Sequence, residues 1–190
     1  MMIVSPQPIY LSPEEYLQME EHSPIKHEYI DGQIYGLAGA LDAHVTIALN
    51  LATDLRNHLR GSGCRIYISD MKAHIESLNR FYYPDVMVTC AQQDQETPAY
   101  KKFPCLIVEV LSDSTEAFDR GDKFADYQQL ESLQEYVLIN GKRQRVECFR
   151  RNGEGLWILQ SYSSEQRSFQ LKSVDFEGTM EALYEDVTFG

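Results

Sequence analysis

Leu-Ile-Val-Glu-Val-Leu, residues 106–111, is an almost continuous apolar run that contains one carboxylate, Glu109. Such a run is typical of a β-strand that is buried on both faces, as in the central sheet of an α/β protein. A buried carboxylate needs a charged or hydrogen-bonding partner, because an unpaired charge is costly to remove from water. The run therefore predicts an α/β core and directs attention to the charged residues that could lie near Glu109.

The rest of the chain alternates between strand and helix patterns. We expect the central sheet to contain residues 65–69, 72–75, 85–89 and 106–111, with a further strand at 136–139. Asp31-Gly32 and the Gly-rich segment 152–155 predict two β-hairpins, at 27–37 and 145–160. Apolar spacing and capping signals predict helices at 11–21, 42–59, 118–130 and 180–184.

The length of 190 residues suits one domain spanning 1–190. Hydrophobic residues make up 43% of the chain, and no run of about 18 apolar residues could span a bilayer. Residues 1–10 lack the basic and apolar regions of a secretory signal. We therefore expect a cytoplasmic protein with no membrane partner.

Four cysteines, Cys64, Cys90, Cys105 and Cys148, are widely and irregularly spaced. They include no Cys-x-x-Cys pair, so soft zinc ligands are not indicated. We expect reduced thiols that pack as small apolar side chains. Any metal in this protein should then be a hard ion bound through oxygen.

The formal net charge of −12 opposes long-range attraction to nucleic acid. This excludes a protein that coats nucleic acid without specificity more firmly than it excludes an enzyme. An enzyme needs only a local site, in which a divalent ion can supply the positive charge.

Three charged residues form the candidate site. Asp85 follows Pro84 at the start of a predicted strand, Glu109 lies within a buried strand, and Lys123 lies on the helix that follows. Two carboxylates on neighbouring strands suit Mg²⁺, which prefers oxygen ligands and retains several waters. A nearby ammonium would orient the attacking water and stabilise a phosphoryl transition state.

Five segments in this order carry a family resemblance: HEYIDGQIY (27–35), FYYPDVMV (81–88), CLIVEVLSDST (105–115), DRGDKFADY (119–127) and LQEYVLIN (133–140). Together with His44, they resemble the Uma-type endonucleases, a former domain of unknown function within the PD-(D/E)XK restriction-endonuclease-like superfamily. The resemblance covers most of residues 10–140. It implies a restriction-endonuclease-like core: a mixed central β-sheet flanked by α-helices, with additional β-hairpins.

The resemblance also implies residue roles. Asp85 and Glu109 would bind Mg²⁺ or Mn²⁺, joined by the backbone carbonyl of Val110, and Lys123 would assist the catalytic base. Glu28 resembles the acidic residue of the superfamily's N-terminal element, which would hold a second metal or position water. The superfamily pattern places the lysine two residues after the glutamate, where this chain has Leu111; the resemblance moves that role to Lys123.

Structural interpretations of the same residues remain open at this point. Glu109 and Lys123 could form a buried ion pair without any chemistry, and Glu28 could simply be exposed. We expect His44 to be a helix cap or a surface residue. Tyr127, four residues after Lys123, is expected to pack against or hydrogen-bond the lysine.

The most basic stretch, residues 142–151, has two interpretations. Strand alternation would place Arg143, Arg145 and Arg151 on one face, where they would contact DNA or protect a solvated edge strand. Asn140 stands where the family commonly has aspartate, which leaves the role of that strand end open.

These observations predict an endonuclease that hydrolyses DNA phosphodiester bonds with Mg²⁺ or Mn²⁺ and without a covalent intermediate. DNA is the expected partner, and a homodimer would supply the two sites needed to cut both strands. Two alternatives stay open: a non-catalytic binding or assembly module with the same fold, which an acidic surface permits, and an enzyme for another phosphate ester.

Overall fold

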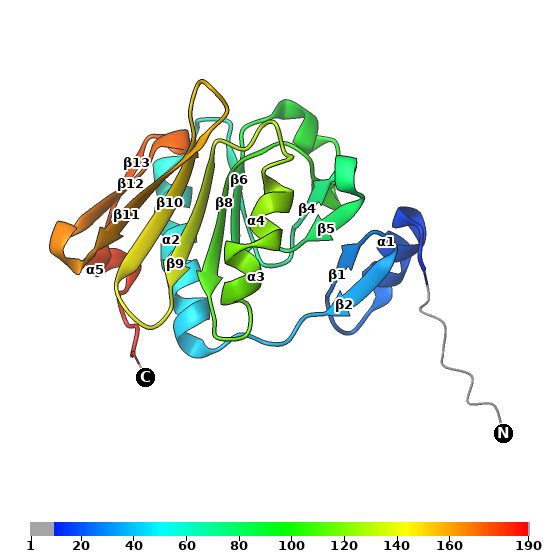
Figure 1. Cartoon of the computed structure of the whole chain (residues 1–190), viewed down its shortest axis with the longest axis horizontal. Coiled ribbons are helices and arrows are strands. Elements are labelled where there is room, and N and C mark those ends of the chain that lie inside the picture. Colours follow the sequence, from blue (N-terminus) through cyan, green and yellow to red (C-terminus); the bar gives the residue numbers. More distant parts are fainter. Residues whose placement is uncertain (1–9, 190) are drawn as a thin grey trace.

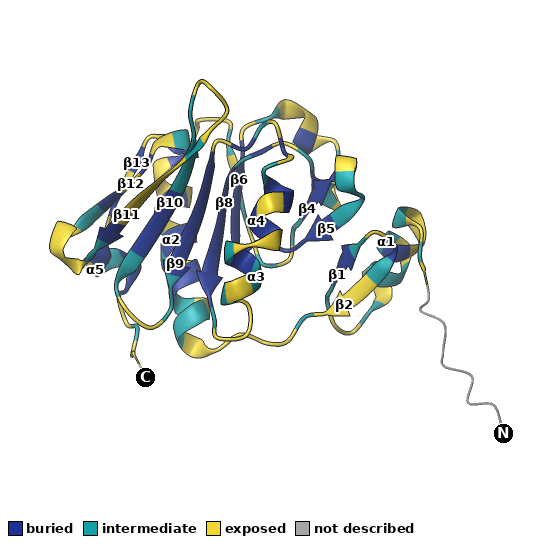
Figure 2. Ribbon diagram, viewed as in Figure 1, coloured by how far each residue is buried: buried dark blue, intermediate teal, exposed yellow. Residues whose placement is uncertain are grey.

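A mixed six-stranded sheet is the centre of the structure, a computed structural model that describes residues 10–189 (Figure 1). Residues 1–9, in which no secretory signal was expected, lie outside the described residues. The strand order is β11-β10-β9-β8-β6-β3, and only the β8–β9 pair is parallel. The bounds are β3 Arg65–Ile68, β6 Val86–Thr89, β8 Pro104–Leu111, β9 Glu135–Asn140, β10 Arg145–Arg151 and β11 Trp157–Ser163. Every residue of β8 except Cys105 is buried, which confirms the central position predicted for this run (Figure 2).

A second sheet has five strands in the order β2-β1-β5-β4-β7. Its strands are β1 His27–Ile30, β2 Gln33–Gly36, β4 Lys72–Ile75, β5 Arg80–Tyr82 and β7 Tyr100–Lys101. The assignment of residues 72–75 to the central sheet was therefore wrong. The chain turns after β3 through Ser69, whose φ of 39° is positive, and β4 then pairs with β5 and β7. A four-residue strand has no local signal that specifies which sheet it joins.

The first helix and both hairpins follow their local sequence signals. Helix α1, Pro13–His22, begins with the predicted capping box, in which Ser12 and Glu15 bond to each other's backbone N–H. Between β1 and β2, Asp31 and Gly32 have φ values of 44° and 93°, as a tight hairpin turn requires. The second hairpin is β10 paired with β11.

Helices cover both faces of the central sheet (Figure 1). Helix α2, Asp42–His58, was predicted and packs Leu51 and Leu55 in one core with residues of β6 and β8. The same core contains residues of the small sheet of β12 (Ser168–Leu171) and β13 (Phe176–Thr179) and of α5 (Met180–Leu183). The two strands β12 and β13 were not predicted, whereas α5 was. No helix among residues 10–189 is both long and apolar enough to cross a membrane.

The helix expected at 118–130 is two short helices on the other face of the sheet. They are α3, Glu116–Arg120, and α4, Asp122–Tyr127, separated at Gly121. Gly121 has φ −111° and ψ −103°, outside the helical region, and a Cβ there would lie 3.1 Å from the Ala117 carbonyl oxygen. The break lies between Asp119 and Lys123, whose side chains still keep the i,i+4 contact, with Lys123 Nζ 3.6 Å from Asp119 Oδ1.

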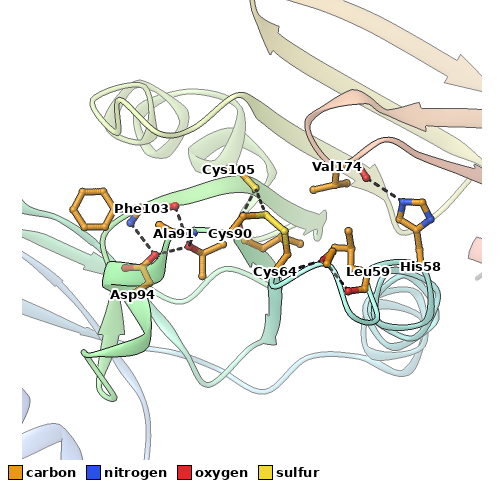
Figure 3. Close-up of a disulfide and its surroundings, with 12 residues drawn as sticks. His58, Leu59, Cys64, Cys90, Ala91, Asp94, Phe103, Cys105 and Val174 are labelled. Carbon is orange, nitrogen blue, oxygen red and sulfur yellow. Dashed lines mark hydrogen bonds between the residues drawn. A yellow bond between two sulfur atoms is a disulfide. The ribbon is translucent and has the colours of Figure 1, made fainter.

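Two of the four cysteines form a disulfide, Cys64–Cys90, so the prediction of four reduced thiols was wrong (Figure 3). They flank the paired residues Arg65 and Thr89 of β3 and β6, which brings their Cα atoms to 4.0 Å. Spacing along the sequence did not reveal this cross-strand proximity. Cys105 and Cys148 are free thiols, as predicted, and the Cys105 Sγ lies 3.9 Å from the Cys90 Sγ.

Candidate functional site

Antiparallel pairing of β6 with β8 brings Asp85 and Glu109 together. Val86 pairs with Val108, so Asp85, one residue before β6, lies opposite Glu109. Opposite residues of an antiparallel pair project from the same face of a sheet. The Asp85 N–H donates to Glu109 Oε2 at 3.3 Å, and the Val110 N–H donates to Asp85 Oδ2 at 2.7 Å. Two carboxylates that lie 24 residues apart in the sequence therefore share one end of the strand pair.

Lys123 reaches the same place from α4. Its Nζ lies 3.0 Å from Glu109 Oε1, 3.2 Å from Glu28 Oε1 and 3.6 Å from Asp119 Oδ1. The lysine is only 6% exposed. One buried ammonium is therefore surrounded by carboxylates from β1, β8 and α3, and the predicted convergence of Glu109 and Lys123 is present in the structure.

Glu28 belongs to this cluster. Strand β1 pairs with β2 on one side and β5 on the other, and this position leaves Glu28 only 7% exposed. The interpretation of Glu28 as a simply exposed residue was wrong. Its contact with Lys123 joins the second sheet to the site.

Helix α4 is held in place by the second sheet. Arg80 and Tyr82, both on β5, donate hydrogen bonds to Asp126 of α4. On the other side of the helix, Phe124 stacks on Tyr136 of β9 with ring centroids 4.8 Å apart. These contacts fix the direction from which Lys123 approaches the carboxylates.

Two further side chains complete the hydrogen bonding of the acids. His44, at the start of α2, places Nε2 2.8 Å from Asp85 Oδ1, so its interpretation as a cap or surface residue was wrong. The Tyr127 hydroxyl donates to Glu109 Oε1 at 3.2 Å. Tyr127 thus supports the carboxylate, whereas the sequence suggested contact with the lysine.

Three carboxylates surround one ammonium in the cluster, so the charges do not balance. Burial raises the pKa of Glu109 well above its ordinary value, Lys123 opposes this shift, and Asp85 and Asp119 reinforce it. Burial also raises the pKa of Asp119, with Lys123 opposing. Burial alone would lower the pKa of Lys123, but Glu109, Glu28 and Asp119 together raise it. With its pKa raised, the lysine keeps its proton near neutral pH and is suited to act as a cation rather than as a base.

The cluster opens into a cleft with a volume of about 870 Å³. Glu28, His44, Asp85, Glu109 and Lys123 all line it. A substrate in this cleft would therefore meet both members of the carboxylate pair, the ammonium and the imidazole. The arrangement suits a reaction in which negative charge develops on an oxygen-rich group.

The donor set fits a hard divalent cation. Among residues 10–189, no group of three or more His, Cys, Asp or Glu side chains is arranged to hold a metal. Asp85 and Glu109 alone would supply the side-chain ligands, which suits Mg²⁺ or Mn²⁺ because these ions keep waters or bind substrate oxygens at the remaining positions. The excess of carboxylates over the single ammonium favours a bound cation. Val110 contacts the pair through its N–H, and its carbonyl remains a predicted ligand.

Arg145 and Arg151 of the basic stretch make contacts within the protein. Arg143 precedes β10, so the expected face of three arginines on one strand was wrong. Arg145 pairs with Glu147, and Arg151 donates to the carbonyls of Gln128 and Glu131. Strand β10 lies between β9 and β11, so it is not the edge strand of the alternative interpretation either.

Asn140 has a local role at the end of β9. Its Oδ1 accepts hydrogen bonds from the backbone N–H groups of Lys142 and Arg143, at 2.9 and 3.1 Å. Aspartate could accept the same bonds. The residue that departs from the family pattern therefore closes a turn.

Sequence reasoning missed Asp119 and the contact of His44. Asp119 stands four residues before Lys123, a spacing that predicts an ion pair on one helical face, so a local signal was present. The contact between His44 and Asp85 depends on the position of α2 relative to the sheet. The sequence has no local signal for that position.

The comparisons with known proteins agree with this architecture. The model of the family described as "Uma2: Putative restriction endonuclease" matches residues 13–181. Two relatives from Synechocystis are uncharacterized proteins: slr1290 is 41% identical over 94% of both chains, and sll1609 is 36% identical over 90% of this chain and 97% of its own. A crystal structure described as a putative nuclease belonging to DUF820 from Anabaena variabilis matches with a TM-score of 0.75 and 14% identity, over 92% of this chain and 97% of that chain. With its matched residues extending from α1 to α5, the chain belongs to the Uma2 family.

Proposed function

We propose that this protein is a metal-dependent nuclease that hydrolyses DNA phosphodiester bonds. The observation that carries the proposal is the group formed by Asp85, Glu109 and Lys123, which line the cleft, with Glu109 contacting both of the others. Membership of the family described as "Putative restriction endonuclease" supports nucleic acid as the substrate. The order of the three residues also resembles a PD-(D/E)XK site in which the lysine comes from a following helix.

Asp85 and Glu109 would hold the cation, with Val110 adding its carbonyl. A bound Mg²⁺ or Mn²⁺ would supply charge neutralisation at the scissile phosphate and would acidify the attacking water. Lys123 remains charged, so it orients water and stabilises the negative charge that develops on the phosphate oxygens. Glu28 and Asp119 hold the ammonium in position through their contacts with Lys123.

A cleavage assay tests this proposal. Purified protein is incubated with plasmid, single-stranded and branched DNA, with Mg²⁺, with Mn²⁺ and with EDTA. We expect cleavage of at least one substrate that requires the metal and is lost in Asp85→Asn, because the amide no longer offers a charged ligand. Failure to cut any of the three substrates with either metal would contradict the proposal.

A matched pair of lysine variants separates chemistry from folding. Lys123 and Lys101 are both buried, but Lys101 bonds to the backbone carbonyls of Asp94 and Thr97, away from the carboxylate cluster. Lys123→Met should abolish cleavage and Lys101→Met should retain it, with thermal melts recorded for both. If Lys123→Met mainly loses its fold, the cluster is a structural ion pair.

Titration calorimetry with Mn²⁺ separates the nuclease from a non-catalytic module. The proposal predicts one Mn²⁺ site that Asp85→Asn weakens, whereas a binding or assembly module should bind none there. Light scattering in the same buffers tests the expected homodimer. An activity confined to other phosphate esters would keep the metal site and change the substrate.

A further inference from the structure

One wall of the cleft consists of exposed apolar side chains, in contrast to the buried acidic cluster that also lines the cleft. Leu41, Val45 and Leu49 stand four residues apart from the start of α2 onward and line the cleft together with Ile25 and Ile68. All five are exposed to solvent. Exposed apolar side chains that cluster in a cleft often mark a ligand-binding surface.

The cations of the cleft are already paired. Among the described residues that line it, the basic side chains besides His44 are three lysines. Lys26 pairs with Asp70 at 2.8 Å, Lys142 pairs with Asp113 at 2.5 Å, and Lys123 lies within the carboxylate cluster. Duplex DNA is held mainly through contacts to the phosphates on its outer surface. The cleft offers a duplex few of those contacts. The net charge of −12 opposes any DNA, and it opposes the duplex more because the duplex carries about twice as many phosphates per unit length as one strand.

Unpaired nucleotides fit the same wall better. Their bases have exposed apolar faces, whereas the faces of paired bases are stacked inside the helix. A volume of about 870 Å³ also lies within the range of pockets that enclose small ligands, about 300–1,000 Å³. A cleft of this volume can enclose a short stretch of one strand.

We propose that the cleft selects unpaired DNA, with the bases of a single strand lying against Leu41, Val45 and Leu49 and the adjoining phosphodiester directed to Asp85 and Glu109. The inference rests on the nuclease function proposed above and narrows its substrate class. The wall is continuous with the site, because one cleft contains both sets of side chains. In this arrangement the phosphates away from the site remain in solvent, so they need no cationic groove.

Fluorescence anisotropy tests the preference directly. A labelled single-stranded oligonucleotide of mixed sequence and its duplex are titrated with the whole protein, in EDTA and again with Ca²⁺, so that binding is measured apart from Mg²⁺- or Mn²⁺-dependent cleavage. We expect the single strand to bind at least about tenfold more tightly, with a log–log salt slope no steeper than about −1 because few phosphates are neutralised. Equal or tighter binding of the duplex, or no binding of either DNA in both buffers, would overturn the inference.

A matched pair of surface variants locates the binding. The double variant Val45→Ser, Leu49→Ser should weaken single-strand binding about tenfold, because base contact with two apolar side chains is lost. Ile158→Ser on β11 is the control: Ile158 is 55% exposed, Leu49 is 56% exposed, and Ile158 does not line the cleft. Unchanged binding in the double variant, or the same loss in both proteins, contradicts the assignment. If light scattering shows that the double variant dissociates a dimer, the wall is an interface between copies and the inference falls.

The two proposals fail in different ways. Metal-dependent cleavage restricted to duplex DNA, and lost in Asp85→Asn, would overturn the single-strand inference and leave the nuclease intact. Tight single-strand binding that depends on Val45 and Leu49, without cleavage of any DNA, would overturn the nuclease and leave the binding surface.

Discussion

Neighbouring strands of the central sheet each bury a carboxylate, Glu109 in β8 and Glu135 in β9, and the protein surrounds the two differently. Glu135 receives Arg150 Nε at 2.7 Å and both the N–H and the hydroxyl of Ser173. One guanidinium balances one carboxylate there. Glu109 shares its one ammonium with Glu28 and Asp119 and lies beside Asp85.

The two clusters differ in whether the protein itself balances their charges. The Glu135 cluster has balanced charge and satisfied hydrogen bonds, as a structural ion pair requires. The Glu109 cluster has excess negative charge and opens into a cleft, so a cation and an anionic substrate would complete it. Burial and pairing are common to both clusters, and only the charge balance and the cleft separate them.

The substitution Glu109→Gln tests the difference between the two clusters with the largest expected effect. The amide keeps the shape and can still accept from Tyr127, but it loses the charge that would bind the metal. Cleavage should fall about 10³-fold or more, which is about 4 kcal/mol of transition-state stabilisation. Urea unfolding without metal should show little loss, because Glu28 and Asp119 still pair with Lys123. A large loss of stability with normal activity would make the two clusters alike.

The reciprocal change is Glu135→Ala. It leaves the Arg150 guanidinium without its carboxylate, although Gln160, Tyr162 and the Gln170 carbonyl still accept from it. We expect a loss of about 3–4 kcal/mol in the free energy of unfolding. The folded fraction should keep its cleavage rate per molecule and its affinity for Mn²⁺. Urea unfolding and calorimetry measure the two quantities, and a loss of Mn²⁺ binding in the folded protein would contradict the structural role of Glu135.

Local signals in the sequence predicted much of the fold and part of the site. The apolar run around Glu109 predicted a buried strand, and Asp31-Gly32 predicted a hairpin, because both depend on neighbouring residues. The sheet that contains β4 and the cross-strand approach of Cys64 to Cys90 were missed. These depend on long-range pairing, which periodicity along the chain does not encode.

The residues of the site also differ in whether a local signal in the sequence could reveal them. Asp85, Glu109 and Lys123 were singled out from the strand and helix pattern, and a family resemblance supported their grouping, because nothing in their spacing of 24 and 14 residues places them together. Asp119 could have been found from its four-residue spacing to Lys123. The burial of Glu28 and the contact of His44 required the packing of the second sheet and of α2.

Reduction of the disulfide tests whether this bond, at one end of β6, affects the candidate site at the other end. Asp85 precedes this strand and Cys90 follows it, so the disulfide and the site lie at opposite ends. The disulfide joins residues that are 26 positions apart, and removing it should cost about 2–3 kcal/mol of stability through the entropy of the unfolded chain. Cleavage by the folded protein should not change. Thermal melts and cleavage with and without dithiothreitol check this, and loss of activity without loss of stability would connect the disulfide to the site.

The pH dependence of Mn²⁺ affinity is the smallest expected effect. It tests the difference between the environments of Glu109 and Glu135 most closely. A carboxylate binds a metal only after it loses its proton, and burial raises the pKa of Glu109 above its ordinary value of 4.5. Without metal, the folded protein therefore keeps this proton at pH values where the unfolded chain has lost it, so Glu109 makes the metal-free fold less stable as pH rises above 4.5. Metal binding would reverse that penalty, because the ionised carboxylate would gain a cation.

Mn²⁺ affinity should consequently keep rising above the pH at which an ordinary glutamate is fully ionised, by no more than about tenfold per pH unit for one released proton. Calorimetry in two buffers with different ionisation enthalpies measures that release. Glu109→Gln should abolish both the binding and the proton release, whereas Glu135→Gln should retain them. If affinity is constant between about pH 5 and 7, Glu109 is already ionised without metal, and its environment is balanced in the same way as that of Glu135.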